Sequence, residues 1–151
     1  MKKQLCVLLG CVFILGATAC GAEEEIQGAA TATMEQNGAV VTMTFDAKGD
    51  VVTKITQESV IDLSAYTEEQ IAVINENVAT AEELYGDMEG IEYSCQESEG
   101  QMVEKIVIPT DEDTLKAAME QGLLPVDNED TTQLSLEATI DNLESAGWTV
   151  E

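Results

Sequence analysis

The sequence predicts an α+β fold in which an antiparallel β-sheet of about five or six strands packs against about three α-helices. Strand-like segments follow one another as hairpins joined by short turns, with helical segments after them. This order favours antiparallel pairing over the alternating parallel α/β arrangement. Of the 151 residues, 44% are hydrophobic and recur with clear periodicity, so one domain can bury a core despite a formal net charge of −24.

Three strands are expected before the first helix. Residues 31–35 and 40–46 predict a hairpin, because Asn37-Gly38 between them tolerates the positive φ angles of a tight turn. A second turn over residues 47–50 leads into a half-exposed strand at about 51–61. The N-terminal half of the sheet is therefore predicted to be a meander.

The first helix is predicted from its cap. Thr67 and Gln70 have the spacing of a capping box, in which each side chain binds a backbone N–H of the other residue. Gly86 occupies the position expected just after the last helical residue. An apolar stripe at spacings of three and four residues is expected to pack on the sheet: Ile71, Ile74, Val78, Ala81 and Tyr85.

The C-terminal half predicts one more hairpin and two more helices. Residues 91–95 and 102–108 form the hairpin, and Pro109 ends it. A short helix is expected between Thr110 and about Gly122, with acidic residues at its start. The third helix starts near Ser135, ends at Gly147 and is followed by a closing strand at 148–150.

The first residues have the pattern of an export signal. Lys2 and Lys3 precede an uncharged apolar run, which passes through the small residues 16–19 to Cys20. This junction resembles the lipobox of bacterial lipoproteins, which implies that Cys20 is acylated and becomes the N-terminus. Cys11 fits the same local pattern, but too little apolar chain precedes it. The alternative is an uncleaved anchor helix over residues 5–22.

These observations divide the chain into three parts. Residues 1–19 are the predicted lipoprotein signal peptide, residues 20–29 a lipidated acidic tether, and residues 30–151 a single α+β domain. Both interpretations of the N-terminus place residues 21–151 outside the cytoplasm, so the expected location is the extracytoplasmic side of a bacterial cell membrane.

The cysteines argue against an internal disulfide. Cleavage would remove Cys6 and Cys11, and acylation would occupy the sulfur of Cys20. Cys95 remains, and strand alternation places it on the same side as Ile91 and Tyr93. We therefore expect Cys95 to be a small buried apolar residue, since no basic residue lies near it in the sequence to lower its pKa.

Several segments in a fixed order carry a family resemblance. They are 45–54, 66–69, 85–86 with 90–91, 134–136 and 143–148. Together they resemble the YehR-like family of small, uncharacterised bacterial lipoproteins, over about residues 30–151. Trp148 stands where that family commonly has Phe. The resemblance implies a lipoprotein with a compact α+β domain and no known reaction.

The composition excludes several kinds of chemistry. The chain has no His and no Arg, and its acidic charge opposes binding to nucleic-acid phosphates. The loop acids Asp127, Glu129 and Asp130 offer oxygen ligands for Ca²⁺, but Ala138 stands where an EF-hand-like loop needs a bidentate Glu. Asp111 to Asp113 are explained as helix N-terminal charges. The sequence predicts no catalytic, cofactor-binding or metal-ligating residue, and therefore no cofactor.

The leading functional hypothesis is a membrane-anchored extracytoplasmic binding or interaction module without catalysis. Its expected partners are membrane lipid through acylated Cys20 and either a basic protein segment or a divalent cation. One alternative is a carboxylate-based cell-envelope hydrolase, which requires two facing acids and a raised pKa on one of them. The other is a structural or charge-buffering envelope protein.

Overall fold

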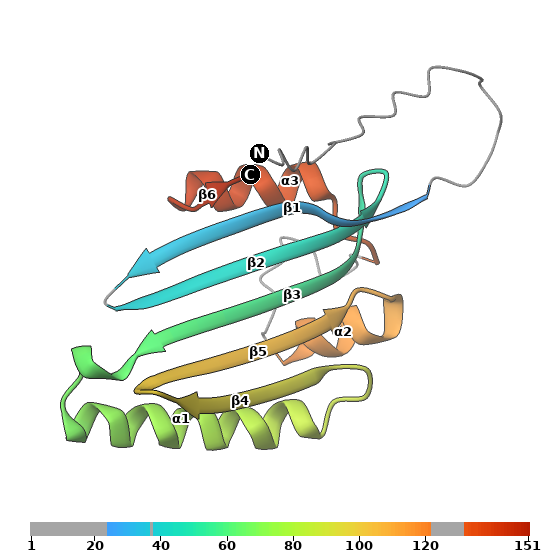
Figure 1. Cartoon of the computed structure of the whole chain (residues 1–151). Coiled ribbons are helices and arrows are strands. Elements are labelled where there is room, and N and C mark those ends of the chain that lie inside the picture. The colour runs from blue at the N-terminus through green and yellow to red at the C-terminus, as the bar shows by residue number, and fades with distance from the viewer. Residues whose placement is uncertain (1–23, 37, 122–131) are drawn as a thin grey trace, which may run out of the picture.

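The computed structural model describes residues 24–36, 38–121 and 132–151. It contains one six-stranded antiparallel sheet in the order β4-β5-β3-β2-β1-β6, with three α-helices and one short 3-10 helix (Figure 1). The α+β prediction is confirmed. The strands are β1 (Glu25–Gln36), β2 (Ala39–Lys48), β3 (Val51–Asp62), β4 (Glu92–Ser98), β5 (Gln101–Pro109) and β6 (Thr149–Val150).

Turn residues with positive φ join the hairpins. Gly49, with a φ of 61°, turns β2 into β3. Glu99 and Gly100, with φ values of 54° and 81°, form the two-residue link between β4 and β5. Both central residues of a type I′ turn need positive φ, so this link matches the twist of its flanking strands. The turn is shorter than the predicted one, and β4 extends through Ser98.

The first strand begins earlier than the sequence suggested. β1 starts at Glu25, within the segment assigned to the tether at residues 20–29, and pairs with the end of β2 through Glu25↔Lys48 and Ile26↔Ala47. The register shifts between Ile26 and Ala30, and Gly28 lies in this bulge with a φ of 62°. Because these residues lack apolar alternation, their pairing depends on partners that lie about twenty residues away in the sequence.

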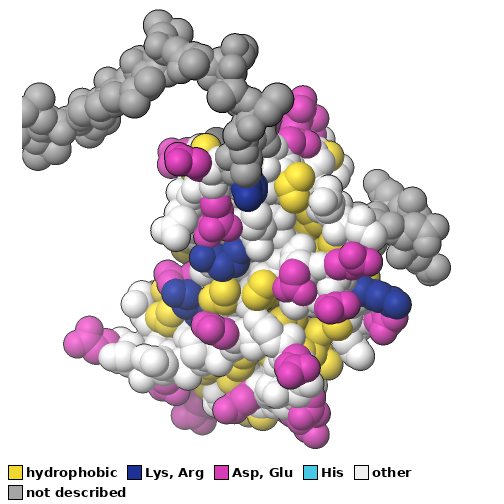
Figure 2. Space-filling model, turned by 90° about the vertical axis from the view of Figure 1, so that its right-hand side faces the viewer, with side chains coloured by type: hydrophobic (Ala, Val, Ile, Leu, Met, Phe, Trp, Pro, Cys, Tyr) yellow, Lys and Arg dark blue, Asp and Glu magenta, His cyan; other side chains and the backbone are white. Residues whose placement is uncertain are grey.

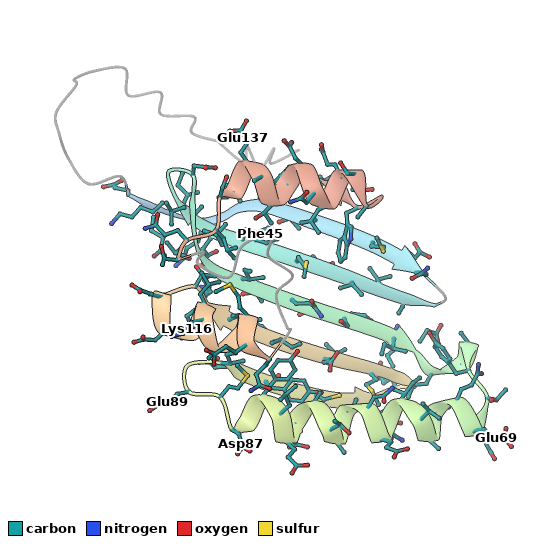
Figure 3. All side chains as sticks on the ribbon, turned by 180° about the vertical axis from the view of Figure 1, so that it is seen from behind. Phe45, Glu69, Asp87, Glu89, Lys116 and Glu137 are labelled. Atoms are coloured by element: carbon teal, nitrogen blue, oxygen red, sulfur yellow. The ribbon has the colours of Figure 1, made fainter. Side chains whose placement is uncertain are left out.

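The three α-helices lie on one side of the sheet (Figures 1 and 3). They are α1 (Glu68–Gly86), α2 (Glu112–Glu120) and α3 (Leu136–Ser145), and the 3-10 helix η1 (Leu63–Ala65) links β3 to α1. The predicted capping box is present: Gln70 N–H donates to Thr67 Oγ1 at 3.3 Å, and Thr67 N–H donates to Gln70 Oε1 at 2.9 Å. Among the described residues no helix is long and apolar enough to cross a bilayer.

Two predicted helix ends have different outcomes. Gly86 was expected just after α1, but it is the last residue of the helix, and Asp87 caps it with right-handed backbone angles. Gly147 does take the expected role after α3. Its φ is 92°, and Trp148 N–H donates to Leu143 O at 3.0 Å, which is the bond of a Schellman motif.

The core lies between the sheet and the helices. Phe45, Val52 and Leu115 are the largest fully buried side chains. Half-buried residues of α1, α3 and the C-terminal strand surround the central cluster, among them Tyr85, Ile140, Leu143 and Trp148. α1 itself has no fully buried residue, so it covers the sheet beside β4 without entering the centre of the core.

Candidate functional site

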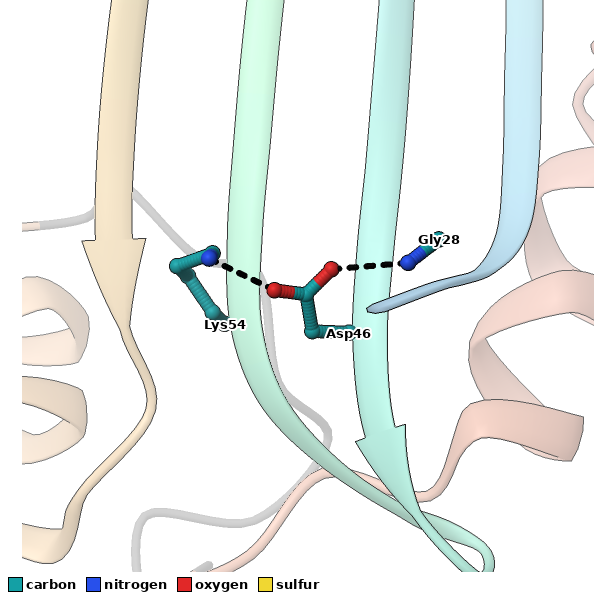
Figure 4. Close-up of polar contacts among 3 residues, drawn as sticks. All are labelled: Gly28, Asp46 and Lys54. Carbon is teal, nitrogen blue, oxygen red and sulfur yellow. Dashed lines mark hydrogen bonds and ion pairs between the residues drawn. The ribbon is translucent and has the colours of Figure 1, made fainter. Parts of the chain in front are cut away.

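A buried carboxylate joins the first three strands at the end of the sheet where β1 begins (Figure 4). Asp46 on β2 accepts from the Gly28 N–H at 2.9 Å and forms an ion pair with Lys54 Nζ at 2.6 Å. The Asp46 side chain is 8% exposed, whereas that of Lys54 is 39% exposed. The cluster therefore links the bulged start of β1 to β2 and, through Lys54, to β3.

The electrostatics of this cluster favour the charged state of both groups. Burial alone would raise the pKa of Asp46, but the hydrogen bonds from Lys54 and from the Gly28 N–H outweigh burial, and the pKa is lowered. The hydrogen bond to Asp46 raises the pKa of Lys54. Both pKa shifts favour the ionised form of the pair. This is the behaviour of an ion pair with a structural role, which we call the clamp.

The sheet face opposite the helices carries both acidic and basic residues. Its centre, which we call the central open face, comprises Val40, Thr42, Thr44 and Asp46 of β2, Lys54, Thr56, Glu58 and Val60 of β3, and Val103, Lys105 and Val107 of β5. Asp46 lies opposite Lys54 in the register, and Glu58 lies opposite Lys105. The remaining residues are uncharged and β-branched. The central open face thus carries two acids and two bases, and the flanking strands add Glu35 of β1 and Glu92 of β4 on the same side of the sheet.

Figure 2 views the end of the molecule at which β1 begins. Most of the lysine side chains in this view form a column on the left, the side of the open face, while carboxylates lie on both sides. The helices hold much of the excess negative charge. α1 contains five Glu and α3 contains three acids, and neither helix contains a base. The two sides of the sheet therefore differ in electrostatic character.

The C-terminal end of α1 concentrates this charge at an unfavourable place. A helix C-terminus carries a partial negative charge, which normally attracts Lys or Arg. The last turn of α1 has no basic residue, and Glu82, Glu83 and the capping residue Asp87 lie there instead. Glu89 follows close by (Figure 3). Positive charge brought to this end of α1 would relieve the repulsion among these groups.

Two open hollows lie at the same end of α1. The first, about 400 Å³, is lined by Thr80, Glu83, Leu84, Asp87, Met88 and Gln121. The second, about 410 Å³, is lined by Glu89, Gly90, Asp113, Thr114 and Ala117. Each hollow combines carboxylates with apolar carbon. This lining suits a long basic side chain, whose stem packs on apolar carbon while its charged end meets a carboxylate.

The packing of α1 on β4 includes a tyrosine pair. The rings of Tyr85 and Tyr93 stack with centroids 5.3 Å apart, and Tyr93 Oη donates to Glu104 Oε1 at 2.8 Å. Cys95 lies on the same side of β4 as Tyr93, as predicted, but it is half-buried instead of fully buried. Burial and the nearby Glu104, Glu82 and Glu97 raise the pKa of the Cys95 thiol, which agrees with its expected inert character.

Of the acidic residues and the lipidation site considered in the sequence analysis, the structure describes only some. Asp111 is the N-cap of α2 and accepts from Thr114 N–H at 3.1 Å, so its predicted place among the acids at the start of this helix is confirmed. Asp127, Glu129 and Asp130 lie outside the described residues, as does the predicted lipidation site Cys20. In the parts of the chain that the structure describes, no group of three or more Cys, Asp or Glu side chains is arranged to hold a metal ion.

Sequence reasoning missed the role of Asp50. This turn residue lies at the start of α3: its Oδ1 accepts from Glu137 N–H at 2.8 Å, and its Oδ2 accepts from Ser135 Oγ at 2.7 Å. The hydrogen bonds from Glu137, Ser135 and Leu136 lower the pKa of Asp50, although burial opposes them. Asp50 and Ser135 both belong to segments that carry the family resemblance. The contact between them gives a structural reason for these two segments to occur together.

None of the described carboxyl groups with a clear pKa shift has the raised pKa that the acid of a hydrolase requires. Asp46, Asp50, Asp62 and Asp111 all have a lowered pKa, since hydrogen bonds or ion pairing outweigh burial in each case. Groups of this kind favour the ionised form and serve as acceptors in the fold. No described observation favours the hydrolase alternative.

Comparisons with known proteins agree with the fold. The model of a family described as a protein of unknown function (DUF1307) matches residues 29–149. The NMR structure of the E. coli YehR protein has a TM-score of 0.60 and 18% identity, and the match covers 85% of this chain and 91% of that one. An NMR structure of a Streptococcus pneumoniae TIGR4 protein has a TM-score of 0.57 and 12% identity, with 100% and 98% covered. No curated protein sequence matches the chain.

Proposed function

Because the chain belongs to the DUF1307 family, whose description names no activity, we propose a function from the surface of the molecule itself. The protein is a membrane-anchored extracytoplasmic binding module without catalysis, held in the bilayer through acylated Cys20. Its acidic helix side receives a basic segment of another envelope protein. The observation that carries this proposal is the pair of acidic hollows at the C-terminal end of α1.

The binding mode follows from the helix end. The carboxylates of Glu83 and Asp87 lie beside the apolar side chains of Leu84 and Met88 in one hollow. A Lys or Arg side chain placed there gains from both carboxylates and from the partial negative charge of the helix terminus. A divalent cation is the other expected partner, and it would meet the same carboxylates.

The anchor suits this function because of where the described chain begins. β1 starts at the end of the sheet that also holds the end of β5 and the start of α2 (Figure 1). The tether would therefore hold the acidic hollows near the membrane side of the domain. A partner with a basic juxtamembrane segment could reach them there.

The test uses the full chain in detergent micelles and a fluorescent peptide of alternating Lys and Leu. Wild type is expected to bind the peptide, and binding should weaken as salt rises. Replacing Glu83→Gln together with Asp87→Asn should weaken binding by at least about fivefold, the effect of losing two exposed ion pairs.

The matched control removes two charges from the other end of the same helix. Glu68→Gln with Glu69→Gln lies about 27 Å away along α1, several screening lengths from the hollows, and should change binding by less than about twofold. Equal loss in both double variants would show a response to net charge alone. Absence of peptide binding by wild type would contradict the basic partner, and competition by Ca²⁺ at matched ionic strength would favour the cation.

A further inference from the structure

β4 is an outer strand of the sheet, and its free edge is regular. In the strand order it has only β5 as a neighbour, and its seven residues pair with β5 without a shift of register. β4 contains no Pro and no Lys, the residues that commonly block an open edge. The opposite edge differs, because β6 has two residues and β1 beside it carries the bulge at Gly28. β4 is therefore the edge at which the sheet can be extended.

The β4–β5 hairpin determines which backbone groups of β4 point outward. Its two-residue turn makes Ser98 and Gln101 a hydrogen-bonded pair, and such pairs recur at every second residue of an antiparallel ladder. The alternate residues Tyr93, Cys95 and Glu97 therefore direct their N–H and C=O groups away from β5. Within the described residues, no backbone bond from a turn, cap or loop reaches these groups. Their spacing is the one with which an added strand pairs.

The free edge of β4 is accessible. Five of the seven residues of β4 are exposed. α1 packs along β4 at this margin of the sheet, on the helix side (Figures 1 and 3). Because α1 has no fully buried residue, its apolar stripe retains surface that an added strand can cover.

We infer that the free edge of β4 binds a basic segment of another protein, which pairs with β4 as an additional extended strand. The backbone groups of β4 supply the hydrogen bonds, and the side chains around the edge select the charge of the partner. This inference goes beyond the proposed function, because it rests on the backbone of β4 and on no contact of the acidic hollows.

Charge complementarity selects a basic occupant. The charged residues of β4 are Glu92 and Glu97, and both are exposed. Glu82 of α1 adds a third carboxylate, which lies near enough to help raise the pKa of the Cys95 thiol. In the register β4 pairs with one base, Lys105 of β5, so the carboxylates outnumber it. The β4 edge of a second copy would bring like charges together, which opposes pairing between copies.

The first test compares Glu97→Pro with Glu97→Gln in the full chain in detergent micelles. The probe is the fluorescent peptide of alternating Lys and Leu. Both variants remove the same charge, but only Pro removes the outward N–H, which the bonds to β5 do not use. Glu97→Pro is expected to bind the peptide about fivefold more weakly than Glu97→Gln. Circular dichroism checks the fold, and equal binding by two correctly folded variants would overturn the inference.

Amide hydrogen exchange of the wild-type chain, followed by NMR, tests the same contact without a substitution. Saturating peptide is expected to slow exchange at Tyr93, Cys95 and Glu97 by about tenfold or more and to leave the amides of α3 unchanged. Unchanged exchange at these three residues would overturn the inference. Protection that is present without peptide and is lost on dilution would indicate pairing between two copies and would also overturn it. The variants of the hollows are measured separately, so either proposal can fail alone.

Discussion

At the residue scale, single carboxylates join segments that lie far apart in the sequence. Asp46 holds β1 through Gly28 and β3 through Lys54, while Asp50 holds the start of α3. An acidic chain could be expected to use its carboxylates only on the surface. Here two of them satisfy backbone donors that would otherwise lack an acceptor at a bulge and at a helix start.

Replacing Asp46 tests the clamp directly. Asp46→Ala removes the acceptor of the Gly28 N–H and the partner of Lys54, so the free energy of unfolding should fall by about 1–3 kcal/mol in urea titrations. Asp46→Asn keeps an acceptor near Gly28 and should cost less. Equal losses in the two variants would assign the whole effect to the ion pair and contradict a role for the Gly28 contact.

The pKa of Asp46 also predicts a dependence on pH. Because the pKa is lower in the folded than in the unfolded state, the folded state binds fewer protons, and the contribution of Asp46 is present above the unfolded pKa of about 3.9. The difference in unfolding free energy between wild type and Asp46→Asn should be constant above about pH 5 and shrink as pH falls below about 4. A difference that is the same at all pH values would contradict this account.

At the element scale, two glycines at helix ends should respond in opposite directions to the same change. Gly147→Ala places a side chain at a φ of 92° and should lower the free energy of unfolding by roughly 1–2 kcal/mol. Gly86→Ala lies within α1 with no atom near its new Cβ, so it should raise that free energy by about 0.5–1 kcal/mol. Thermal unfolding of both variants gives the comparison, and a loss in Gly86→Ala would contradict a helical backbone at Gly86.

The sequence was informative about elements whose signals are local. The period of the apolar stripe and the Thr67–Gln70 capping box predicted α1, and alternation predicted β2, β3 and β5. The first residues of β1 could not be predicted, because Glu25 to Gly28 lack alternation and owe their place to the ends of β2 and β3. The role of Asp50 was equally hidden, since its partners in α3 lie 85 and 87 residues away.

In the candidate site, too, the local features could be predicted from the sequence and the long-range contacts could not. The acidic residues of α1 are visible in the sequence, but their meeting with α2 in two hollows depends on how both helices pack. The placement of charges on the open face depends on register, because only strand pairing places Glu58 opposite Lys105. Composition predicted an acidic molecule, and the fold decides where that charge is concentrated.

At the scale of the whole molecule, the formal net charge of −24 opposes the compact state through self-repulsion. Raising NaCl from about 0.01 to 1 M shortens the screening length from about 30 to 3 Å, so the melting temperature should rise. CaCl₂ at matched ionic strength serves as the comparison. An equal rise in both salts indicates screening, a larger rise with CaCl₂ indicates specific cation binding, and a fall in NaCl would contradict the role of self-repulsion.

The task proposed for the acidic end of α1 is to bind a basic segment of another envelope protein. This proposal requires a protein held outside the cytoplasm on a lipid anchor, so the anchor is the central claim.

The most direct test is the intact mass of the full-length gene product recovered from the membrane fraction of the producing cells. The account predicts a chain that begins at Cys20, has 151 − 19 = 132 residues and carries additional mass from acyl groups on that cysteine. A chain that retains residues 1–19, carries no lipid and is recovered with the cytosolic proteins would contradict it.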